Sequence, residues 1–349
     1  MENNTKPEAY LAQSLKESKG ELPIPLTRVE TYLYRVAQSM NKCVSALTNG
    51  WYQVFEFVDE IPISFSLRDI FTSITIPDNT TSISEYAFEN CTSLSSVTIP
   101  ESVKFIGRCA FKSCTSLKHI SIPTGVTTIR EETFRGCTSL SNIILSNVTS
   151  IQDGAFRNCA KLENVTLSDA LKNLYDNAFR DCTSLKTIAI PSSLYMIGKY
   201  AFMGCDSLAN VTISDGVGII DTSAFQNCTS LENIVIPSSV GNIEDYAFRG
   251  CTSLTSIVIP RGLRIRTGAF SYCTSLASVI MPDSITNIED YAFKSCTSLK
   301  TITIPSSVTS IAASAFDASG LETITINKPE GSISGAPWGA TNATVVWNG

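Results

Sequence analysis

Cysteine is the residue type whose number and spacing most suggest chemistry. The chain of 349 residues has twelve cysteines, an even number that in a small secreted protein would suggest disulfides. Because ten of them recur at a fixed position, we expect a stack of buried thiols that behave as small apolar side chains. A linear stack also cannot supply the converging ligands of a zinc site. The ten are Cys91, Cys114, Cys137, Cys159, Cys182, Cys205, Cys228, Cys251, Cys273 and Cys296.

The other residue types that support catalysis are sparse. His119 is the only histidine, and its place among repeat substitutions favours a surface variant over a general base. The carboxylates occupy recurring positions, and the common phosphate-binding, dinucleotide-binding, zinc-protease and serine-hydrolase motifs do not occur. We therefore expect a non-enzymatic protein with no catalytic residue, no metal ligand and no cofactor.

A repeated segment positions the cysteines. One copy reads IEDYAFRGCTSLTSIVIP, residues 243–260, and near copies run from about residue 74 to 326. The reference phenylalanines are 23 residues apart, or 22 just before Phe156 and Phe270. A period of this length with aliphatic residues at fixed offsets predicts a solenoid. The references are Phe88, Phe111, Phe134, Phe156, Phe179, Phe202, Phe225, Phe248, Phe270, Phe293 and Phe316.

Each repeat predicts one short strand and one helical turn. The I-x-I pair, such as Ile257 and Ile259, has the period of a strand whose aliphatic side chains point inward. Equivalent strands of successive coils can pair as a long parallel sheet. The D-Y-A-F-R segment reads as a helical turn, with an acidic residue such as Asp245 near its start and a basic one such as Arg249 near its end, as the helix dipole favours.

The repeat pattern A-F-x-x-C-x-x-L-x-x-I-x-I-P-x-x-V-x-x-I resembles the BspA-type leucine-rich repeat of bacterial surface proteins and some protist proteins. The resemblance implies a right-handed, curved leucine-rich-repeat solenoid of about eleven coils, used in adhesion or protein binding. It also implies an extracellular, cell-surface or virion location, although the N-terminus has no apolar segment of a secretory signal. The segment LPIPLTRVETYLYRVA resembles short N-terminal modules of phage or prophage structural proteins.

The repeats divide the chain into four parts. Residues 1–26 read as a flexible segment with a proline-rich linker, 27–71 as a helix with a capping unit, 72–326 as the repeat array and 327–349 as a C-terminal cap. The helix is expected over 27–48, with a capping box formed by Thr27 and Glu30.

The same helix carries a heptad-like apolar seam. Either the seam forms a short coiled coil that makes the protein a homo-oligomer, or it packs on the first coil or on residues 51–71. The second alternative is favoured because a coiled coil is usually sustained over more heptads. The seam consists of Val29, Leu33, Val36, Met40, Cys43 and Leu47.

Composition excludes some partners. The net charge is −6, which argues against nucleic acid, since a nucleic-acid partner requires a basic surface. The sequence has no apolar run of the length that a membrane-spanning helix needs, so we expect no membrane insertion. Protein and glycan ligands both remain open.

Residues between the inward aliphatic positions should face outward and are the best candidates for binding. Among them, Val235, Val258 and Ile280 occupy one position in three consecutive coils and should form an exposed apolar strip. The alternative is that β-branched residues simply suit strands. The candidate partner-binding residues are Ile144, Asn210, Asn233, Val235, Ser256, Val258 and Ile280.

Two functional hypotheses follow. The first is a non-enzymatic adhesion or binding solenoid that presents a Ser/Thr/Asn-rich parallel sheet to a protein or glycan. The second is a structural component of a phage virion or surface appendage, in which the N-terminal helix is the assembly module.

Overall fold

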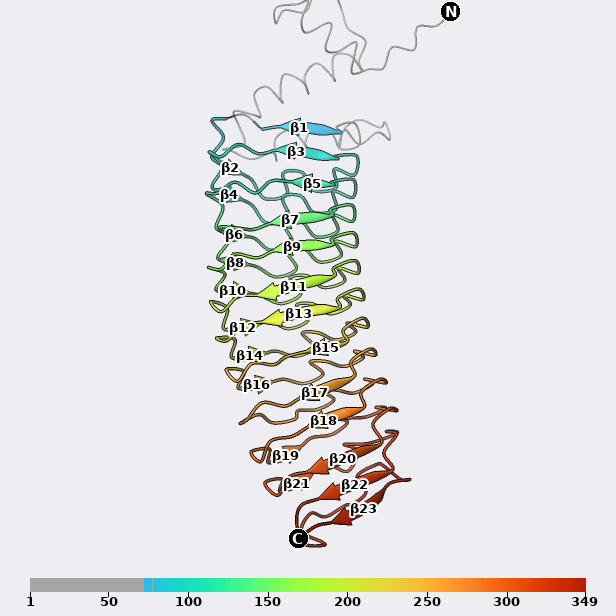
Figure 1. The fold of residues 1–349 in the computed structure, drawn as a ribbon. Coiled ribbons are helices and arrows are strands. Elements are labelled where there is room, and N and C mark those ends of the chain that lie inside the picture. Colours follow the sequence, from blue (N-terminus) through green and yellow to red (C-terminus); the bar gives the residue numbers. More distant parts are fainter. Residues whose placement is uncertain (1–71, 77) are drawn as a thin grey trace, which may run out of the picture. The chain divides into compact units, whose positions relative to one another are not determined.

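The repeat array forms a stack of coils in which most coils contribute two short strands (Figure 1). The computed structural model describes residues 72–76 and 78–349, which lie within the unit Phe65–Gly349. The expected N-terminal segment, helix and capping unit, with Val29, Leu33, Val36, Met40 and Leu47, lie outside the described residues.

The I-x-I segments form one row of parallel strands, which we call the major row. Most neighbouring strands pair in register, for example Ile188 with Val211 and Val258 with Ile280, although three interruptions divide the row into four hydrogen-bonded sheets. This confirms the expected strand in each repeat. The row consists of β1 (Ser73–Thr75), β3 (Ser96–Thr98), β5 (His119–Ile120), β7 (Asn142–Ile144), β9 (Asn164–Thr166), β11 (Thr187–Ile190), β13 (Asn210–Ile213), β15 (Asn233–Ile234), β17 (Ser256–Val258), β18 (Ser278–Ile280), β20 (Thr301–Ile304), β22 (Thr323–Ile326) and β23 (Thr344–Trp347).

A second row of parallel strands, the minor row, is formed by two-residue segments that the repeat pattern did not predict. Each ends on the aliphatic residue five positions before a reference phenylalanine, as Ile83 does before Phe88. Segments this short show no alternation from which a strand could be recognised. The row consists of β2 (Ser82–Ile83), β4 (Phe105–Ile106), β6 (Thr128–Ile129), β8 (Ser150–Ile151), β10 (Asn173–Leu174), β12 (Met196–Ile197), β14 (Ile219–Ile220), β16 (Asn242–Ile243), β19 (Asn287–Ile288) and β21 (Ser310–Ile311).

The segment around each reference phenylalanine is not the helical turn that its sequence predicts. Tyr86 and Asn90 have φ values of 58° and 60°, outside the range of a right-handed helix. The N–H of Glu89 donates within the coil to Tyr86 at 3.1 Å, whereas the N–H of Phe88 donates to Ala110 of the next coil at 2.7 Å. This alternation excludes the i to i−4 pattern of an α-helix. The described part of the chain consequently contains turns and no helix.

Without a helix dipole, the charged residues beside the phenylalanines need a different explanation. Several of them form ion pairs between successive coils. Arg108 contacts Glu131 at 3.1 Å, and Lys294 contacts Asp317 at 2.8 Å. At these positions the recurrence of charge reflects contacts along the stack.

The phenylalanines form the centre of the core. Eleven rings stack almost parallel, with centroids 5.0 Å apart between Phe88 and Phe111 and 5.9 Å apart between Phe293 and Phe316. All eleven are buried, and the alanine that usually precedes them is buried as well. A small side chain at that position lets adjacent coils approach closely.

The cysteine stack is confirmed, and the structure shows what the thiols do. Cys114 Sγ lies 3.0 Å from the carbonyl oxygen of Phe88 in the preceding coil, and Cys251 Sγ lies 3.2 Å from that of Phe225. The Phe88 oxygen also accepts the backbone N–H of Cys91 at 3.1 Å. The thiol therefore donates to a buried carbonyl that has a second lone pair to satisfy. None of the eleven described cysteines forms a disulfide.

The last coils depart from the repeat. Ser319 stands where the cysteine would be, and its hydroxyl has no hydrogen-bond partner. The backbone ladder nevertheless continues, because the N–H of Phe316 donates to Trp338 at 3.0 Å and the Trp338 side chain is buried. The segment expected to be a C-terminal cap adds β23 to β22, so the stack has about twelve turns.

The buried thiols should be almost unreactive in the native protein. Burial raises the pKa of Cys251 and of Cys296 to about 12, so few thiolates exist at neutral pH. We expect labelling of the ladder cysteines by a disulfide reagent to be at least about a thousandfold slower than in urea, because access requires opening of the core. Labelling resolved by peptide mass spectrometry would measure this.

Candidate binding surfaces

The outward-facing strand residues lie where the sequence predicts. The exposed fraction is 80% for Val235, 58% for Val258, 57% for Ile280 and 63% for Ile144. Ile144, Val258 and Ile280 lie on strands and Val235 directly follows one, and in each case the adjacent residues are less exposed. Their exposure is therefore a consequence of strand geometry, and only their apolar character calls for an explanation.

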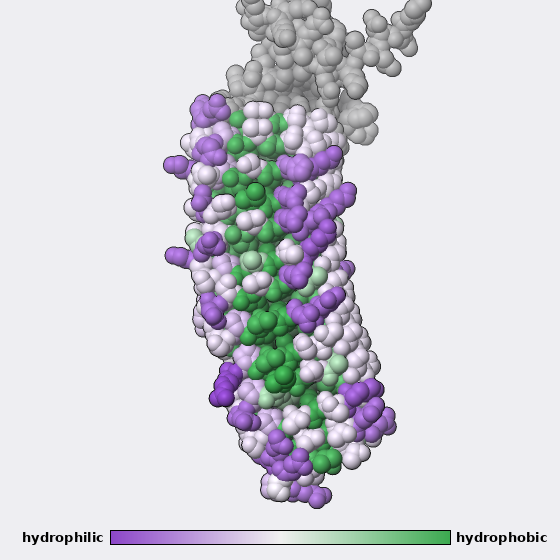
Figure 2. All heavy atoms as spheres, in the orientation of Figure 1, coloured by the Kyte–Doolittle hydropathy of each residue, from purple (hydrophilic) through white to green (hydrophobic). Residues whose placement is uncertain are grey.

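Three of these residues form the predicted strip. Val258 pairs with Ile280 across β17 and β18, and β15, which Val235 follows, lies beside β17. Figure 2 shows an apolar band along this face, flanked by hydrophilic residues. Ile144 lies on β7, several coils away, and is separated from the strip by Thr166, which faces outward on β9. We call Val235, Val258 and Ile280 the apolar strip.

The polar candidates lie two residues before the outward position that the apolar candidates occupy. Asn210 pairs with Asn233 across β13 and β15, and Ser256 begins β17. The Asn233 amide oxygen lies 3.4 Å from the hydroxyl of Thr255. Nothing in the described part of the chain hydrogen-bonds the Asn210 side chain, so its amide is available to a ligand. Farther along the row, Asn164 instead donates to Asn142 at 2.7 Å.

A second set of exposed side chains was not predicted from the sequence. Tyr175, Tyr195 and Met196 are exposed beside β10 and β12 of the minor row. The sequence did contain a signal for part of this set. In the V-x-x-I segment the two middle residues lie between core aliphatics and should be exposed, and in residues 194–197 (L-Y-M-I) they are a tyrosine and a methionine.

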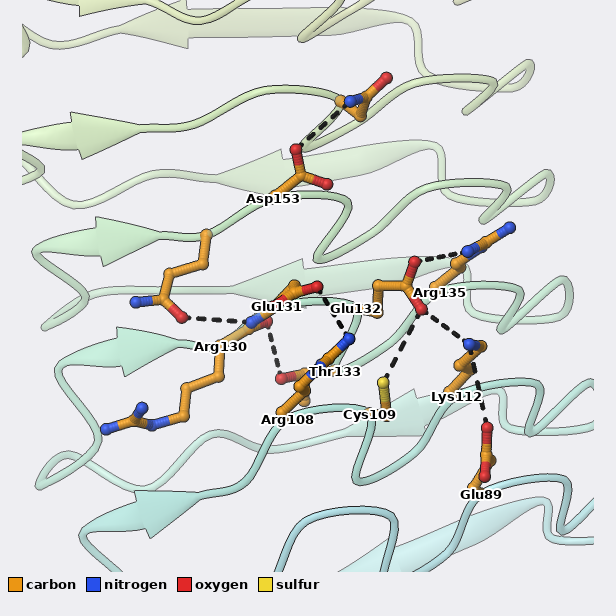
Figure 3. Close-up of polar contacts among 12 residues, drawn as sticks. Glu89, Arg108, Cys109, Lys112, Arg130, Glu131, Glu132, Thr133, Arg135 and Asp153 are labelled. Carbon is orange, nitrogen blue, oxygen red and sulfur yellow. Dashed lines mark hydrogen bonds and ion pairs between the residues drawn. The ribbon is translucent and has the colours of Figure 1, made fainter.

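The densest polar network lies on the turn side of the early coils (Figure 3). Glu132 is its centre: Lys112 Nζ lies 2.7 Å from one carboxylate oxygen, and Arg135 donates to the other. The Cys109 thiol also faces Glu132, with Sγ 3.7 Å from Oε2. Lys112 is 3.9 Å from Glu89 of the preceding coil. The Glu132 carboxylate thus connects two coils, and Lys112 extends the network to a third.

This network is not poised for acid–base chemistry. Burial raises the pKa of the Cys109 thiol, so the nucleophilic thiolate is disfavoured. The hydrogen bond to Glu132 raises the pKa of Lys112. Burial alone would raise the pKa of Glu132, but the hydrogen bonds from Lys112 and Arg135 outweigh it and the pKa is lowered. Each group is held in one protonation state near neutral pH, which a general acid or base must avoid.

Three further possibilities, a catalytic histidine, a metal site and a membrane-spanning helix, gain no support from the described residues. His119 is exposed at the start of β5. Within residues 72–76 and 78–349, no cluster of His, Cys, Asp and Glu could hold a metal ion. Nor does any helix in this part of the chain have the length and apolar character to cross a membrane.

The network instead predicts a contribution to stability. We expect Glu132→Gln to destabilise the protein by about 1 kcal/mol at neutral pH, because Lys112 and Arg135 lose a charged acceptor in a partly buried site. A carboxyl whose pKa is lowered on folding stabilises above its unfolded pKa, and this contribution disappears as the pH falls through the folded value. The difference from wild type should therefore shrink in acid, as urea denaturation at several pH values would measure.

A matched control is Glu163→Gln, which removes an exposed ion pair with Lys186. Exposed pairs contribute little, so this variant should change stability by no more than about 0.5 kcal/mol. Equal effects of the two variants, or a Glu132 effect that persists unchanged in acid, would contradict the assignment.

Comparison with solved structures identifies the fold. A leucine-rich repeat protein from Bacteroides ovatus is 26% identical, with a TM-score of 0.57 over 79% of this chain and 91% of that chain. The pneumococcal vaccine antigen PcpA is 20% identical, with a TM-score of 0.51 over 81% and 78%. A leucine rich cell surface protein from Faecalibacterium prausnitzii is 25% identical, with a TM-score of 0.42 over 80% and 88%.

Comparison with family models shows to which protein family the chain belongs. No curated protein matches the chain significantly. The model of the BspA type leucine rich repeat region matches residues 63–186, 172–266 and 263–336, and so covers most of the sequence. These matches include the phenylalanine stack, the cysteine stack and both rows of strands up to β22. The chain belongs to the BspA-type leucine-rich repeat family.

Proposed function

We propose that this protein is a non-enzymatic binding or adhesion protein that engages a protein ligand through the outward face of the major row. The observation that carries the proposal is the apolar strip, three aliphatic side chains more than half exposed in consecutive coils. Membership of a leucine-rich repeat family is consistent with a binding role. The ligand would place apolar side chains against Val235, Val258 and Ile280.

Strand propensity alone does not account for the strip. Threonine is also β-branched, and it occupies the same position as Thr98, Thr212 and Thr303 in other coils. Threonine would satisfy the backbone preference and remain soluble. Three consecutive coils instead carry valine or isoleucine, which adds exposed apolar surface.

The strip would not be sufficient for tight binding. Burying these partly exposed side chains would contribute roughly 4 kcal/mol in total, given about 1.5–3 kcal/mol for a fully buried aliphatic side chain. The loss of translational and rotational freedom on association costs at least about that much. Polar neighbours such as Asn210, Asn233 and Ser256 would supply hydrogen bonds at the edge of the interface, as in other protein interfaces.

The double variant Val258→Asp with Ile280→Asp tests this surface. Two carboxylates would have to be desolvated at the centre of the interface, so binding should weaken by at least about a hundredfold. The measurement is binding of the full chain to an array of purified extracellular and cell-surface proteins. Thr98→Asp with Thr303→Asp introduces the same two charges at equivalent positions of β3 and β20 and should leave binding unchanged. A panel in which every interaction survives the double variant would exclude the strip.

The second candidate function, an assembly component of a virion or surface appendage, rests on the heptad spacing of Val29, Leu33, Val36, Met40 and Leu47. In this arrangement the helix would join copies of the chain and the repeat array would be the exposed arm.

The oligomeric state tests the assembly function. Leu33→Lys with Met40→Lys should convert a homo-oligomer into a monomer, because charged residues in the seam oppose helix association. Light scattering of the full-length proteins measures this. A monomeric wild-type chain would rule out oligomerisation through the helix.

A further inference from the structure

Two tyrosines of the minor row are unusually exposed for aromatic residues beside strands. The exposed fraction is 65% for Tyr195, which precedes β12, and 47% for Tyr175, which follows β10. Neither belongs to the apolar strip, which lies on the major row. Large exposed aromatic side chains are enriched where proteins bind ligands.

Tyr195 is positioned by a glycine of the next coil. The N–H of Gly218 donates to the Tyr195 carbonyl oxygen at 2.8 Å, which places the two residues side by side. A Cβ atom on Gly218 would lie 2.4 Å from Cε2 and 2.8 Å from Cζ of the tyrosine. The ring therefore lies along the surface, over a backbone that only glycine leaves accessible. Most of the ring remains open to solvent.

The following coil leaves the space beyond the ring open. The N–H of Gly241 donates to Gly218 at 2.8 Å, and a Cβ on Gly241 would meet only the Gly218 oxygen, at 3.9 Å. Gly241 is exposed, so the space above it is open. An aromatic ring and an exposed glycine thus follow one another along the solenoid axis. We call Tyr195, Gly218 and Gly241 the shelf.

Polar side chains without partners border the shelf. Lys172 lies at the equivalent position of the preceding coil, Asn173 begins β10, and Asn242 follows Gly241 at the start of β16. All three are exposed. In the described part of the chain none of their side chains forms a hydrogen bond or an ion pair. Two amides and an ammonium group can therefore donate to a ligand, and the amides can also accept.

We propose that the shelf binds a β-1,4-linked gluco-configured oligosaccharide that runs along the solenoid axis. The axial C–H groups of such a sugar carry partial positive charge and suit the negative face of the Tyr195 ring. Its equatorial hydroxyls can hydrogen-bond Asn242, which lies beside Gly241, and Lys172 and Asn173 lie one coil before Tyr195, where a longer chain would continue. A sugar of this extended chain is about as long as the spacing of neighbouring coils, which is about 4.8 Å.

The matching repeat has a structural consequence. One sugar can stack on the ring above Gly218 while the next, turned by half a revolution about the chain axis, lies over Gly241. Both faces of a gluco-configured ring carry axial C–H groups, so either face can lie against the shelf. An α-1,4-linked chain curves away and cannot maintain this register. The site is separate from the proposed protein-binding strip and does not depend on it.

The test uses the full-length protein with cellotetraose and chitotetraose as probes, and maltotetraose as the α-linked control, in calorimetric titrations. We expect at least one β-linked probe to bind, with maltotetraose at least about tenfold weaker. Tyr195→Ala should weaken binding by about tenfold or more, whereas Tyr195→Phe keeps the ring and should stay within about threefold. Gly241→Leu should block the shelf, and Asn242→Ala provides a milder variant if that substitution impairs folding.

Tyr175→Ala is the matched control, because it removes an exposed tyrosine of the same row that lies beside Gly198 rather than on the shelf. It should bind the sugars as wild type does, as should Val258→Asp with Ile280→Asp. The proposal is overturned if neither β-linked probe binds, if Tyr195→Ala binds them normally, or if maltotetraose binds equally well. Capture of a protein instead of a sugar, in a manner that depends on Tyr195, would also overturn it.

Discussion

Hydrogen bonding between successive coils is the constraint on which the rest of this structure depends. No coil is large enough to hydrogen-bond all of its own backbone groups, so many of its N–H and C=O groups form hydrogen bonds with the neighbouring coils. The major and minor rows do this with parallel strand pairs, and the turns do it through residues such as Phe88, whose N–H reaches Ala110. The phenylalanine carbonyl inside the core then has a lone pair to spare. The cysteine thiol donates a hydrogen bond to this carbonyl oxygen. This explains why the position is occupied by cysteine, a small residue with a weak donor, rather than by alanine.

The sequence was sufficient to predict the features that follow from periodicity. The 23-residue repeat specifies the solenoid, the inward I-x-I aliphatics and the stacking of cysteines, because identical positions in successive coils must share one environment. The exposure of Val235, Val258 and Ile280 follows from the alternation of a strand. The pairing of Val258 with Ile280 follows in turn from their equivalent positions in neighbouring coils.

Two features could not be predicted because they depend on where the backbone hydrogen bonds go. The segment around Phe88 has acidic and basic ends and resembles a helical turn, yet its N–H groups alternate between two coils and Tyr86 adopts a positive φ. The minor row consists of pairs of residues too short to show a pattern. From the sequence alone, Tyr195 is therefore indistinguishable from an ordinary variable residue in a loop. Its relation to Gly218 and Gly241 becomes visible only when the coils are stacked in space.

The direction of the inter-coil bonds also has a mechanical consequence. They run along the solenoid axis, so a pull applied at the two ends of the array loads them in tension one layer after another. Strands that are sheared share a load among many bonds, whereas these layers would separate in sequence, like a zipper. Each coil that opens would release 23 residues, or about 80 Å of extended chain. A protein of this design would yield gradually under force and dissipate work over a long extension, without breaking at a single threshold.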